Sequence, residues 1–421
     1  LNSWEAVYFG HEPERLVALA ADAADLGVER FVLDDGWFGS RRDDSSGLGD
    51  WEVSTDRYPD GLAPLIEGVT GRGMEFGIWI EPEMVNPDSD LYRSHPDWVL
   101  ATPGYEPVMG RRQLVLDLAR PDCFDHVLGA IDRLLGDHEI GYVKWDMNRW
   151  LVQASGADGK AASNAQTRAF RRLVDELRTR HPRVEFESCA SGGGRIDHSV
   201  LEVFERVWTS DCNDAHDRQR INRGASMVVP AEVTGSHVGP SPSHQTGRRL
   251  SMEFRVATAM FGHFGIEADV TAMSDRVGAV LRLGIAVHKR FRDLVHRGDA
   301  VRFDVDDGVV ARGVYAADRS GALLSWARLE SGVSLVPRPW RIPDLDPAGS
   351  YLVDVVSLVP DDDPLAPSRG VVGLAVRQPH WLVECLAGRP VSMSGRRLAT
   401  VGLEPPVTRP ESAVLVHLTR S

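Results

Sequence analysis

The sequence predicts a (β/α)₈ barrel followed by a small antiparallel β-sandwich domain. Three observations support this α/β prediction. The chain has 421 residues, which exceeds one small domain but suits a large barrel with a smaller companion. Over roughly the first 300 residues, short apolar runs alternate with amphipathic helical segments, as in βα units around a parallel sheet. Beyond that point the runs are short and partly alternating, and Gly, Pro and Asp turns separate them, as in an antiparallel sandwich.

The expected barrel strands are apolar runs that end in small or polar residues. They are WEAVYF (4–9), RFVLDD (30–35), EFGIWI (75–80), GYVKWD (141–146), VEFESC (184–189), RVWTSD (206–211) and SMVVP (226–230). Two sets of apolar residues between them each fall on one helical face. These sets are Phe124, Val127, Leu128, Ile131 and Leu135, and Phe170, Leu173, Val174 and Leu177. No glycine-rich phosphate loop follows the first strand, so a barrel is favoured over a doubly wound open sheet.

A long helical stretch at about 276–298 precedes the change in pattern. We therefore expect a catalytic barrel over residues 1–300 and a β-sandwich domain over 301–421. The strands expected in the second domain are VRFDV (301–305), VVARGVYA (309–316), ALLSWARL (322–329), YLVDVV (351–356), VVGLAV (371–376) and AVLVHL (413–418).

Composition restricts the class of ligand. The net charge of −14 argues against a nucleic-acid partner, because such binding depends on a basic face. No apolar run approaches the ~20 residues of a membrane span. The four cysteines lack the close pairing of a zinc site and the density of a disulfide scaffold, so we expect reduced thiols and a cytoplasmic location. The chain begins at Leu1 without a methionine, which indicates an internal start.

Polar and aromatic side chains gather where the predicted barrel strands end. These residues are Asp34, Asp35, Trp79, Glu81, Lys144, Asp146, Cys189, Trp208 and Asp211. In a barrel such positions converge on one mouth, where the active site lies. Carboxylates and cations pair with sugar hydroxyls, while tryptophan faces pack on sugar C–H groups. The set therefore indicates a carbohydrate pocket.

Two of the aspartates are the candidates for catalysis of glycoside hydrolysis, which requires one anionic and one protonated carboxyl group. Lys144 lies two residues before Asp146 and shares its strand face, so its positive charge favours the carboxylate form of Asp146. Desolvation beside the preceding Val-Trp pair favours a protonated Asp211. Aspartates at strand ends often serve only as caps or turn residues. Their occurrence together with Lys, Trp and Cys at several strand ends favours a catalytic role for these aspartates over a capping role.

Other motifs are weaker. HEP (11–13) lacks the second histidine of a zinc-binding helix, and SGGGR (191–195) lacks the ending of a phosphate loop. We therefore expect no metal. Trp79 could equally fill the barrel interior, since aromatic residues near strand ends often do so. Cys189 as a nucleophile has no evident histidine partner nearby in sequence.

Six strings in order carry a resemblance to a known family. They are FVLDDGWFGSRRDDSSGLGDW (31–51), GIWIEPEMVNPDSDLYRSHPDW (77–98), YVKWDMNR (142–149), ESCASGGGRID (187–197), WTSDCNDAHDR (208–218) and SPSHQTGRR (241–249). Together with WEAVYF, they resemble glycoside hydrolase family 36, the α-galactosidases of the melibiase and raffinose-hydrolysing type. The resemblance covers about residues 1–290, and KWDMNR and DDGWFG are its most specific strings.

The resemblance implies retaining hydrolysis without a cofactor. Asp146 would be the nucleophile and Asp211 the acid/base, in agreement with the choice made from the residues alone. The substrate-binding residues implied are Asp34, Asp35, Trp79, Arg111, Lys144, Asn148, Cys189 and Gly192, and Trp208 is a further expected pocket residue. The expected substrates are α-galactosides such as melibiose and raffinose.

Two departures from the family pattern concern the start of the chain and the acid/base string. Family members usually carry a large N-terminal β domain, which this sequence lacks, so we expect a weakened tendency to form a homo-oligomer. Cys212 and Asn213 stand where the family usually has Asn and Thr. The alternatives left open are an α-N-acetylgalactosaminidase, a galactosyl transglycosylase, an inactive galactoside-binding fragment and, last, a metal-dependent barrel hydrolase.

Overall fold

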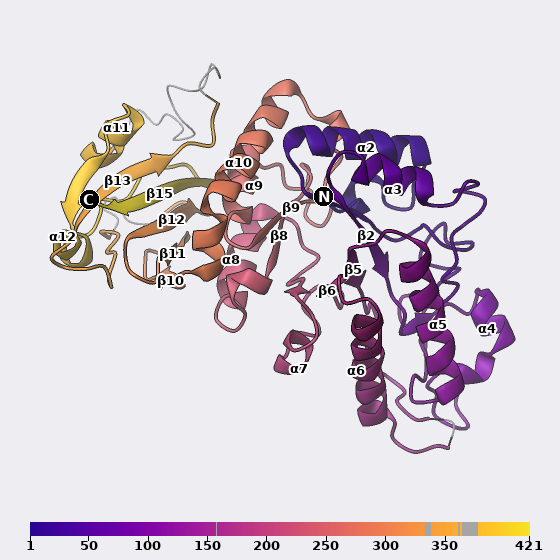
Figure 1. Cartoon of the computed structure of the whole chain (residues 1–421). Helices are drawn as coiled ribbons and strands as arrows, with labels where there is room; N and C mark the ends of the chain where they lie inside the picture. The colour runs from indigo at the N-terminus through magenta and orange to yellow at the C-terminus, as the bar shows by residue number, and fades with distance from the viewer. Residues whose placement is uncertain (157, 333–337, 361–362, 364–377) are drawn as a thin grey trace. The chain divides into compact units, whose positions relative to one another are not determined.

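The computed structural model describes residues 1–156, 158–332, 338–360, 363 and 378–421 (Figure 1). These residues divide into two compact units. The first comprises Leu1–Asp211 and Glu267–Thr271, and the second comprises Cys212–Ile266 and Ala272–Ser421. The compact units follow a different partition from the predicted division at residue 300, which stays a prediction.

A five-stranded parallel sheet organises the first unit. Its strands, in spatial order, are β1 (Arg30–Leu33), β2 (Glu75–Ile80), β5 (Tyr142–Trp145), β6 (Glu185–Ser188) and β7 (Arg206–Val207). β5 is central and fully buried, which explains its continuous apolar character. All five strands lie where the sequence predicts them, and their spatial order follows their chain order. A short antiparallel pair, β3 (Met84–Val85) and β4 (Leu114–Val115), extends from the loops.

Helices alternate with these strands, which confirms the predicted α/β architecture. They are α1 (Trp4–Val7), α2 (Pro13–Leu26), α3 (Ala63–Thr70), α4 (Asp90–Ser94), η1 (Pro96–Trp98), α5 (Pro121–Asp137), α6 (Ser163–Arg180) and α7 (His198–Leu201), with η3 (Val270–Ala272) at the unit boundary. The apolar faces predicted for α5 and α6 are buried along their length. α2 contacts α3 and α5 contacts α6 (Figure 1).

Two strand predictions are wrong. WEAVYF contains helix α1 instead, and only Asn2 forms a parallel bridge, to Val32. SMVVP forms turns after helix α8 (Ala215–Ala225), with Met227 and Val228 exposed. Short apolar runs have no distinctive period, so helix, strand and turn compete for them. A parallel pair in the second unit, β8 (Gly235–Val238) and β9 (His263–Ile266), was not predicted.

The second unit contains further helices and a six-stranded antiparallel sheet. The helices are α8 (Ala215–Ala225), η2 (Ala231–Val233), α9 (Met252–Ala259), α10 (Asp275–Arg297), α11 (His380–Leu386) and α12 (Gly395–Thr400). The sheet, in spatial order, contains β10 (Asp299–Phe303), β11 (Val309–Tyr315), β12 (Gly321–Arg328), β15 (Ser412–Arg420), β13 (Ser350–Val356) and β14 (Val391–Ser394).

The antiparallel prediction is confirmed for five of the expected strands, which are now β10, β11, β12, β13 and β15. β14 was not predicted, and the expected strand VVGLAV lies outside the described residues. In the described part of the chain these strands form one sheet. Trp326 and Tyr351 from this sheet share a buried core with Trp381 of α11 and Leu398 of α12. Helices therefore contribute to the layer that packs against the sheet.

Among the helices that the structure describes, none combines the length and the apolar character needed to cross a bilayer.

Candidate active site

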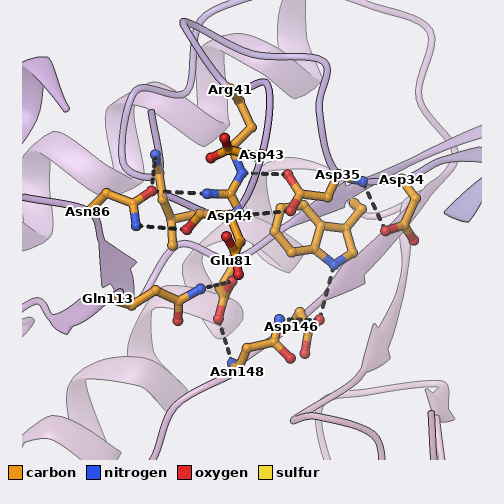
Figure 2. Close-up of polar contacts among 12 residues, drawn as sticks. Asp34, Asp35, Arg41, Asp43, Asp44, Glu81, Asn86, Gln113, Asp146 and Asn148 are labelled. Carbon is orange, nitrogen blue, oxygen red and sulfur yellow. Dashed lines mark hydrogen bonds and ion pairs between the residues drawn. The ribbon is translucent and has the colours of Figure 1, made fainter. Parts of the chain in front are cut away.

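The candidate active site lies where the parallel strands of the first unit end. Asp34 follows β1, Glu81 follows β2, Asp146 follows β5 and Cys189 follows β6. The carboxyl ends of parallel strands meet at one edge of a sheet, so these side chains converge as expected. Figure 2 shows Asp34, Glu81 and Asp146 among the polar contacts of this region.

Asp146 is buried, and four N–H donors surround its carboxylate. Oδ2 accepts hydrogen bonds from Asn148 Nδ2 at 2.7 Å and from Trp79 Nε1 at 3.2 Å. Oδ1 accepts them from the backbone N–H groups of Met147 at 2.8 Å and Ser191 at 3.4 Å. These donors come from three segments and hold the carboxylate in one orientation. Such preorganisation is what a nucleophile requires.

Trp79 contributes more than a packing surface. Its side chain is buried and lies parallel to Phe38, at 6.3 Å between ring centroids. Burial agrees with the alternative that it fills the barrel interior, but the indole N–H points to Asp146. The structure therefore gives this residue both a packing role and a polar role.

Lys144 and Asp34 form a buried ion pair, with 2.8 Å between Lys144 Nζ and Asp34 Oδ2. Burial alone lowers the pKa of Lys144, but the negative charges of Asp34 and Glu267 outweigh this effect and raise its pKa well above the usual value. Burial raises the pKa of Asp34, while Lys144 opposes that shift. Lys144 is therefore a fixed cation beside Asp146.

Asp35 is held by Arg41, which was not among the site residues predicted from the sequence. Arg41 binds it with two hydrogen bonds, from Nε at 2.9 Å and from Nη2 at 2.7 Å, and both residues are buried. Burial raises the pKa of Asp35, and Arg41 opposes this shift. A bidentate arginine fixes the plane of a carboxylate. The plane of the Asp35 carboxylate is thus fixed at the end of β1.

Asp211 has the environment of a proton donor. The residue itself is exposed, but protein atoms crowd its carboxylate, and Trp208 Nε1 donates a hydrogen bond to Oδ1 at 3.1 Å. Desolvation and then the negative charge of Asp146 raise the pKa of Asp211 to about 6, while Lys144 and Arg111 oppose the shift. Desolvation was the cause expected from the sequence. The contribution of Asp146 adds a second cause and indicates that the two carboxylates are near each other.

Cys189 and Gly192 connect Asp146 and Asp211. Cys189 Sγ lies 3.9 Å from Asp211 Oδ1 and accepts a hydrogen bond from Gly192 N at 3.4 Å. Burial and then the charges of Asp146 and Asp211 raise the pKa of the Cys189 thiol well above its usual value. The thiol therefore stays protonated, which argues against its being a nucleophile.

Gly192 allows two loops to approach closely. Its φ is +83°, and a Cβ atom there would lie 2.5 Å from Ser210 Cα and 2.7 Å from Asp211 N. Both the backbone conformation and the contact therefore require glycine.

We expect Gly192→Ala to displace the loop that carries Asp211 and to lower kcat for an unactivated α-galactoside on the order of 100-fold. Gly104→Ala is the matched control, because Gly104 has a similar φ of +84° but no atom within 4 Å of a Cβ. Steady-state kinetics compares the two variants. Equal losses of kcat in the two variants would show that backbone strain, and not the clash with the Asp211 loop, causes the loss.

Glu81 is a central residue whose partners the sequence did not reveal. Its side chain is fully buried, and it accepts hydrogen bonds from the backbone N–H of Asn148 and from Gln113 Nε2, the latter at 3.1 Å (Figure 2). Desolvation and the charge of Asp146 raise the pKa of Glu81 to about 8, while Asn148 and Arg41 oppose the shift. Burial beside Asp146 therefore favours the protonated form of Glu81.

This raised pKa predicts a pH-dependent stability. The folded pKa of about 8 exceeds the ordinary value of 4.5, so the folded protein binds the additional proton between these pH values. The contribution of Glu81 to the free energy of unfolding is therefore present below pH 4.5 and is lost as the pH rises through about 8. As the pH rises from 4.5 to about 8, we expect the thermal midpoint of Glu81→Gln to fall less steeply than that of the parent protein. Glu139→Gln at an exposed position is the control, and parallel midpoint curves for Glu81→Gln and the parent would contradict the assignment.

Arg111 stands on a strained two-residue turn. Gly110 and Gln113 pair through backbone hydrogen bonds of 3.2 and 2.9 Å, and the residues between them, Arg111 and Arg112, have φ values of +51° and +59°. Such conformations cost a non-glycine residue about 1 kcal/mol or more. Arg111 is exposed and influences Asp211 through its charge. The strain therefore occurs at a residue that the family resemblance assigns to the sugar.

The two departures from the family string, Cys212 and Asn213, belong to the second unit. Cys212 is partly buried and lies 3.9 Å from Asp217 Oδ2, measured from Sγ. Asn213 is buried and accepts a hydrogen bond from Arg218 at 3.4 Å. Both side chains thus have partners around the start of α8.

Within the described residues, Asp214, His216 and Asp217 form the one group with the spacing of metal ligands. Asp214 Oδ1 accepts hydrogen bonds from the backbone N–H groups of His216 and Asp217 at the start of α8. It also pairs with Arg248 at 2.6 Å. A helix cap and an ion pair thus account for Asp214.

Comparisons with known proteins give a consistent result. The melibiase family model matches residues 1–298. An α-galactosidase from Escherichia coli is 46% identical over 423 aligned positions, which cover 100% of this chain and 58% of that protein. The α-galactosidase AgaA from Geobacillus stearothermophilus is 39% identical, with 86% of this chain and 51% of that protein covered. This chain therefore spans little more than half the length of these relatives.

Solved structures agree with the sequence comparisons. The crystal structure of the GH36 α-galactosidase AgaA superposes with a TM-score of 0.88 at 34% identity, covering 100% of this chain and 55% of that one. A variant of AgaA in complex with raffinose gives a TM-score of 0.89 at 34% identity, with the same coverage. A further variant was solved in complex with stachyose, with a TM-score of 0.88 at 34% identity and the same coverage.

Proposed function

Because this chain belongs to the melibiase family, we propose that it is a retaining α-galactosidase, which hydrolyses terminal α-galactosyl residues of oligosaccharides such as melibiose and raffinose. The observation that carries the proposal is the carboxylate pair. Asp146 is buried and fixed by four N–H donors, whereas the neighbouring Asp211 has a pKa of about 6. The complexes of AgaA variants with raffinose and stachyose support this class of substrate.

The galactosyl ring would bind between these groups. Asp34, Asp35 and Asn148 offer hydrogen-bonding atoms for its hydroxyl groups, and Lys144 supplies a fixed cation. Trp79 would wall the pocket beside Asp146. Cys189 and Gly192, which the resemblance assigns to the galactose subsite, and Trp208 would line the side nearer Asp211, and Arg111 would reach the sugar from its turn.

The first step forms a covalent intermediate. An oxygen of Asp146 attacks the anomeric carbon from the β face, and the bond from that carbon to the leaving oxygen breaks. Asp211 donates its proton to the leaving oxygen, so the aglycone departs as a neutral alcohol. The products of this step are a β-galactosyl ester of Asp146 and the Asp211 carboxylate.

The second step regenerates both carboxyl groups. The Asp211 carboxylate removes a proton from water, and the water oxygen attacks the anomeric carbon from the α face. The ester bond breaks, Asp146 becomes a carboxylate again, and α-galactose leaves. The pKa of about 6 suits Asp211 to both roles near neutral pH, because neither protonation state is scarce.

Release of p-nitrophenol from p-nitrophenyl α-galactoside by the folded chain tests the proposal. Turnover that exceeds the rate with p-nitrophenyl α-N-acetylgalactosaminide would support the α-galactosidase, and the reverse preference would favour an α-N-acetylgalactosaminidase. Products larger than the substrate would indicate transglycosylation. Binding of galactose without turnover would identify a galactoside-binding fragment, and loss of turnover on chelation would favour the metal-dependent alternative.

Assembly and location are also proposals. We propose a cytoplasmic location, supported by the four free cysteines, and a weakened tendency to form a homo-oligomer, as expected from the sequence. Light scattering coupled to size-exclusion chromatography measures the mass in solution, and fractionation of the source cells measures the location.

A further inference from the structure

We propose that Asn86 is a positioning residue, which holds the strained turn that presents Arg111 to the substrate. Neither the family strings nor the strand-end pattern assigns a role to Asn86. The inference rests on the proposed function, because Arg111 is expected to contact the galactoside. It concerns a residue that does not itself touch the sugar.

The side chain of Asn86 joins two parts of the site. It is fully buried directly after β3, and its Nδ2 donates hydrogen bonds to the carbonyl oxygens of Arg112 at 2.8 Å and Asp44 at 3.3 Å. Its Oδ1 accepts hydrogen bonds from Arg41 Nη1 at 2.9 Å and from the backbone N–H of Leu48 at 3.0 Å. All four hydrogen-bonding positions of the amide are thus occupied.

These bonds connect the turn to Asp35, a carboxylate expected to bind the sugar. Arg41, which donates to Asn86, also binds Asp35 with two hydrogen bonds. Figure 2 shows the sequence of contacts from Asp35 through Arg41 to Asn86. The carbonyl that Asn86 holds belongs to Arg112, the neighbour of Arg111. Asn86 therefore fixes the turn relative to Asp35.

The strain in the turn explains why such a bond is needed. Arg111 and Arg112 both have positive φ, and neither is a glycine. A turn of this kind persists only where its surroundings determine it. The side chain of Arg112 provides little support, because its ion pair with Asp44 is long, at 3.7 Å, and largely exposed. The main-chain bond from the buried Asn86 is the stronger constraint.

The change Asn86→Asp tests this role with little change in shape. A carboxylate keeps the acceptors for Arg41 and Leu48 but replaces the donor that Arg112 O requires. We expect KM for p-nitrophenyl α-galactoside to rise about tenfold or more, with kcat within about threefold of the parent value, since the lost contact acts on binding. If Asn86→Asp does not fold, Asn86→Ser takes its place in the same comparison.

A double-mutant cycle with Arg111→Ala shows whether Asn86 acts through Arg111. In the Arg111→Ala background, we expect Asn86→Asp to change kcat/KM by less than about threefold, because the residue it positions is gone. A loss by the same factor in both backgrounds would overturn the inference. A parent enzyme without turnover would instead refute the proposed function, so the two failures are distinguishable.

Relief of strain provides an independent readout. Glycine adopts a positive φ without a steric penalty, so Arg112→Gly should restore KM in the Asn86→Asp variant. Asp44→Ala is the matched control, because it removes the ion pair with Arg112 but keeps the carbonyl oxygen that Asn86 binds. It should leave KM within about twofold of the parent value. No restoration by Arg112→Gly, or a loss in Asp44→Ala equal to that in Asn86→Asp, would contradict the role.

Discussion

Asp146→Ala is expected to lower kcat for p-nitrophenyl α-galactoside by a factor on the order of 10⁴, because no other group can form the covalent intermediate. We expect the variant to stay folded, although four N–H donors lose their acceptor. Steady-state kinetics measures the loss, and thermal unfolding checks the fold. Asp122→Ala, at an exposed carboxylate paired with Arg120, is the control and should keep parent activity.

Addition of azide to Asp146→Ala provides a second test of this prediction. The space left by the carboxylate in Asp146→Ala is open to a small anion, which can attack the anomeric carbon from the same side. We expect azide to restore release of p-nitrophenol and to produce β-galactosyl azide, in which azide has displaced the leaving group with inversion. Formation of α-galactosyl azide, or activity near the parent value without azide, would contradict the assignment of Asp146 as the nucleophile.

Asp211→Ala is expected to show an effect that depends on the leaving group. With melibiose, whose leaving alcohol needs a proton, kcat/KM should fall by about 10²–10⁴. With 2,4-dinitrophenyl α-galactoside, whose leaving group departs as a stable anion, kcat/KM should change far less. Comparison of the two substrates measures the effect. An equal loss with both would show that Asp211 is not the acid.

The pH profile tests the same residue. A proton donor with a pKa of about 6 loses its proton as the pH rises, so kcat/KM of the parent for melibiose should fall above this pH. Asp211→Ala has no such group, and its profile should lack this decline. Arg111 opposes the raised pKa of Asp211, so loss of Arg111 should move the decline to higher pH. A decline that persists unchanged in Asp211→Ala would have another origin.

Much of the site could be predicted from sequence because strand geometry is local. Lys144 and Asp146 lie two residues apart at the end of an apolar run, and a strand places such residues on one face. In the structure Lys144 is buried beside Asp34, and the negative charge of Asp146 contributes to the raised pKa of Lys144. The roles of Asp146 and Asp211 stay predictions, but their different environments fit those roles.

The supporting contacts could not be predicted, because they join segments far apart in the chain. Arg41 and Asn86 are 45 positions apart, and Asn148 and Glu81 are 67 apart. No local period encodes such pairs. Glu81 was among the strand-end residues expected from the sequence, but its hydrogen-bond partners were not. The errors at WEAVYF and SMVVP have a different cause, namely that short apolar runs do not specify one secondary structure.

The central claim is double displacement through Asp146, and the anomer of galactose that appears first tests it most directly. Proton NMR during the hydrolysis of p-nitrophenyl α-galactoside distinguishes the two anomers before they interconvert. The account predicts that α-galactose appears first, because two inversions at the anomeric carbon restore its configuration. Initial β-galactose would mean that water attacks directly, and Asp146 would then not form a covalent intermediate.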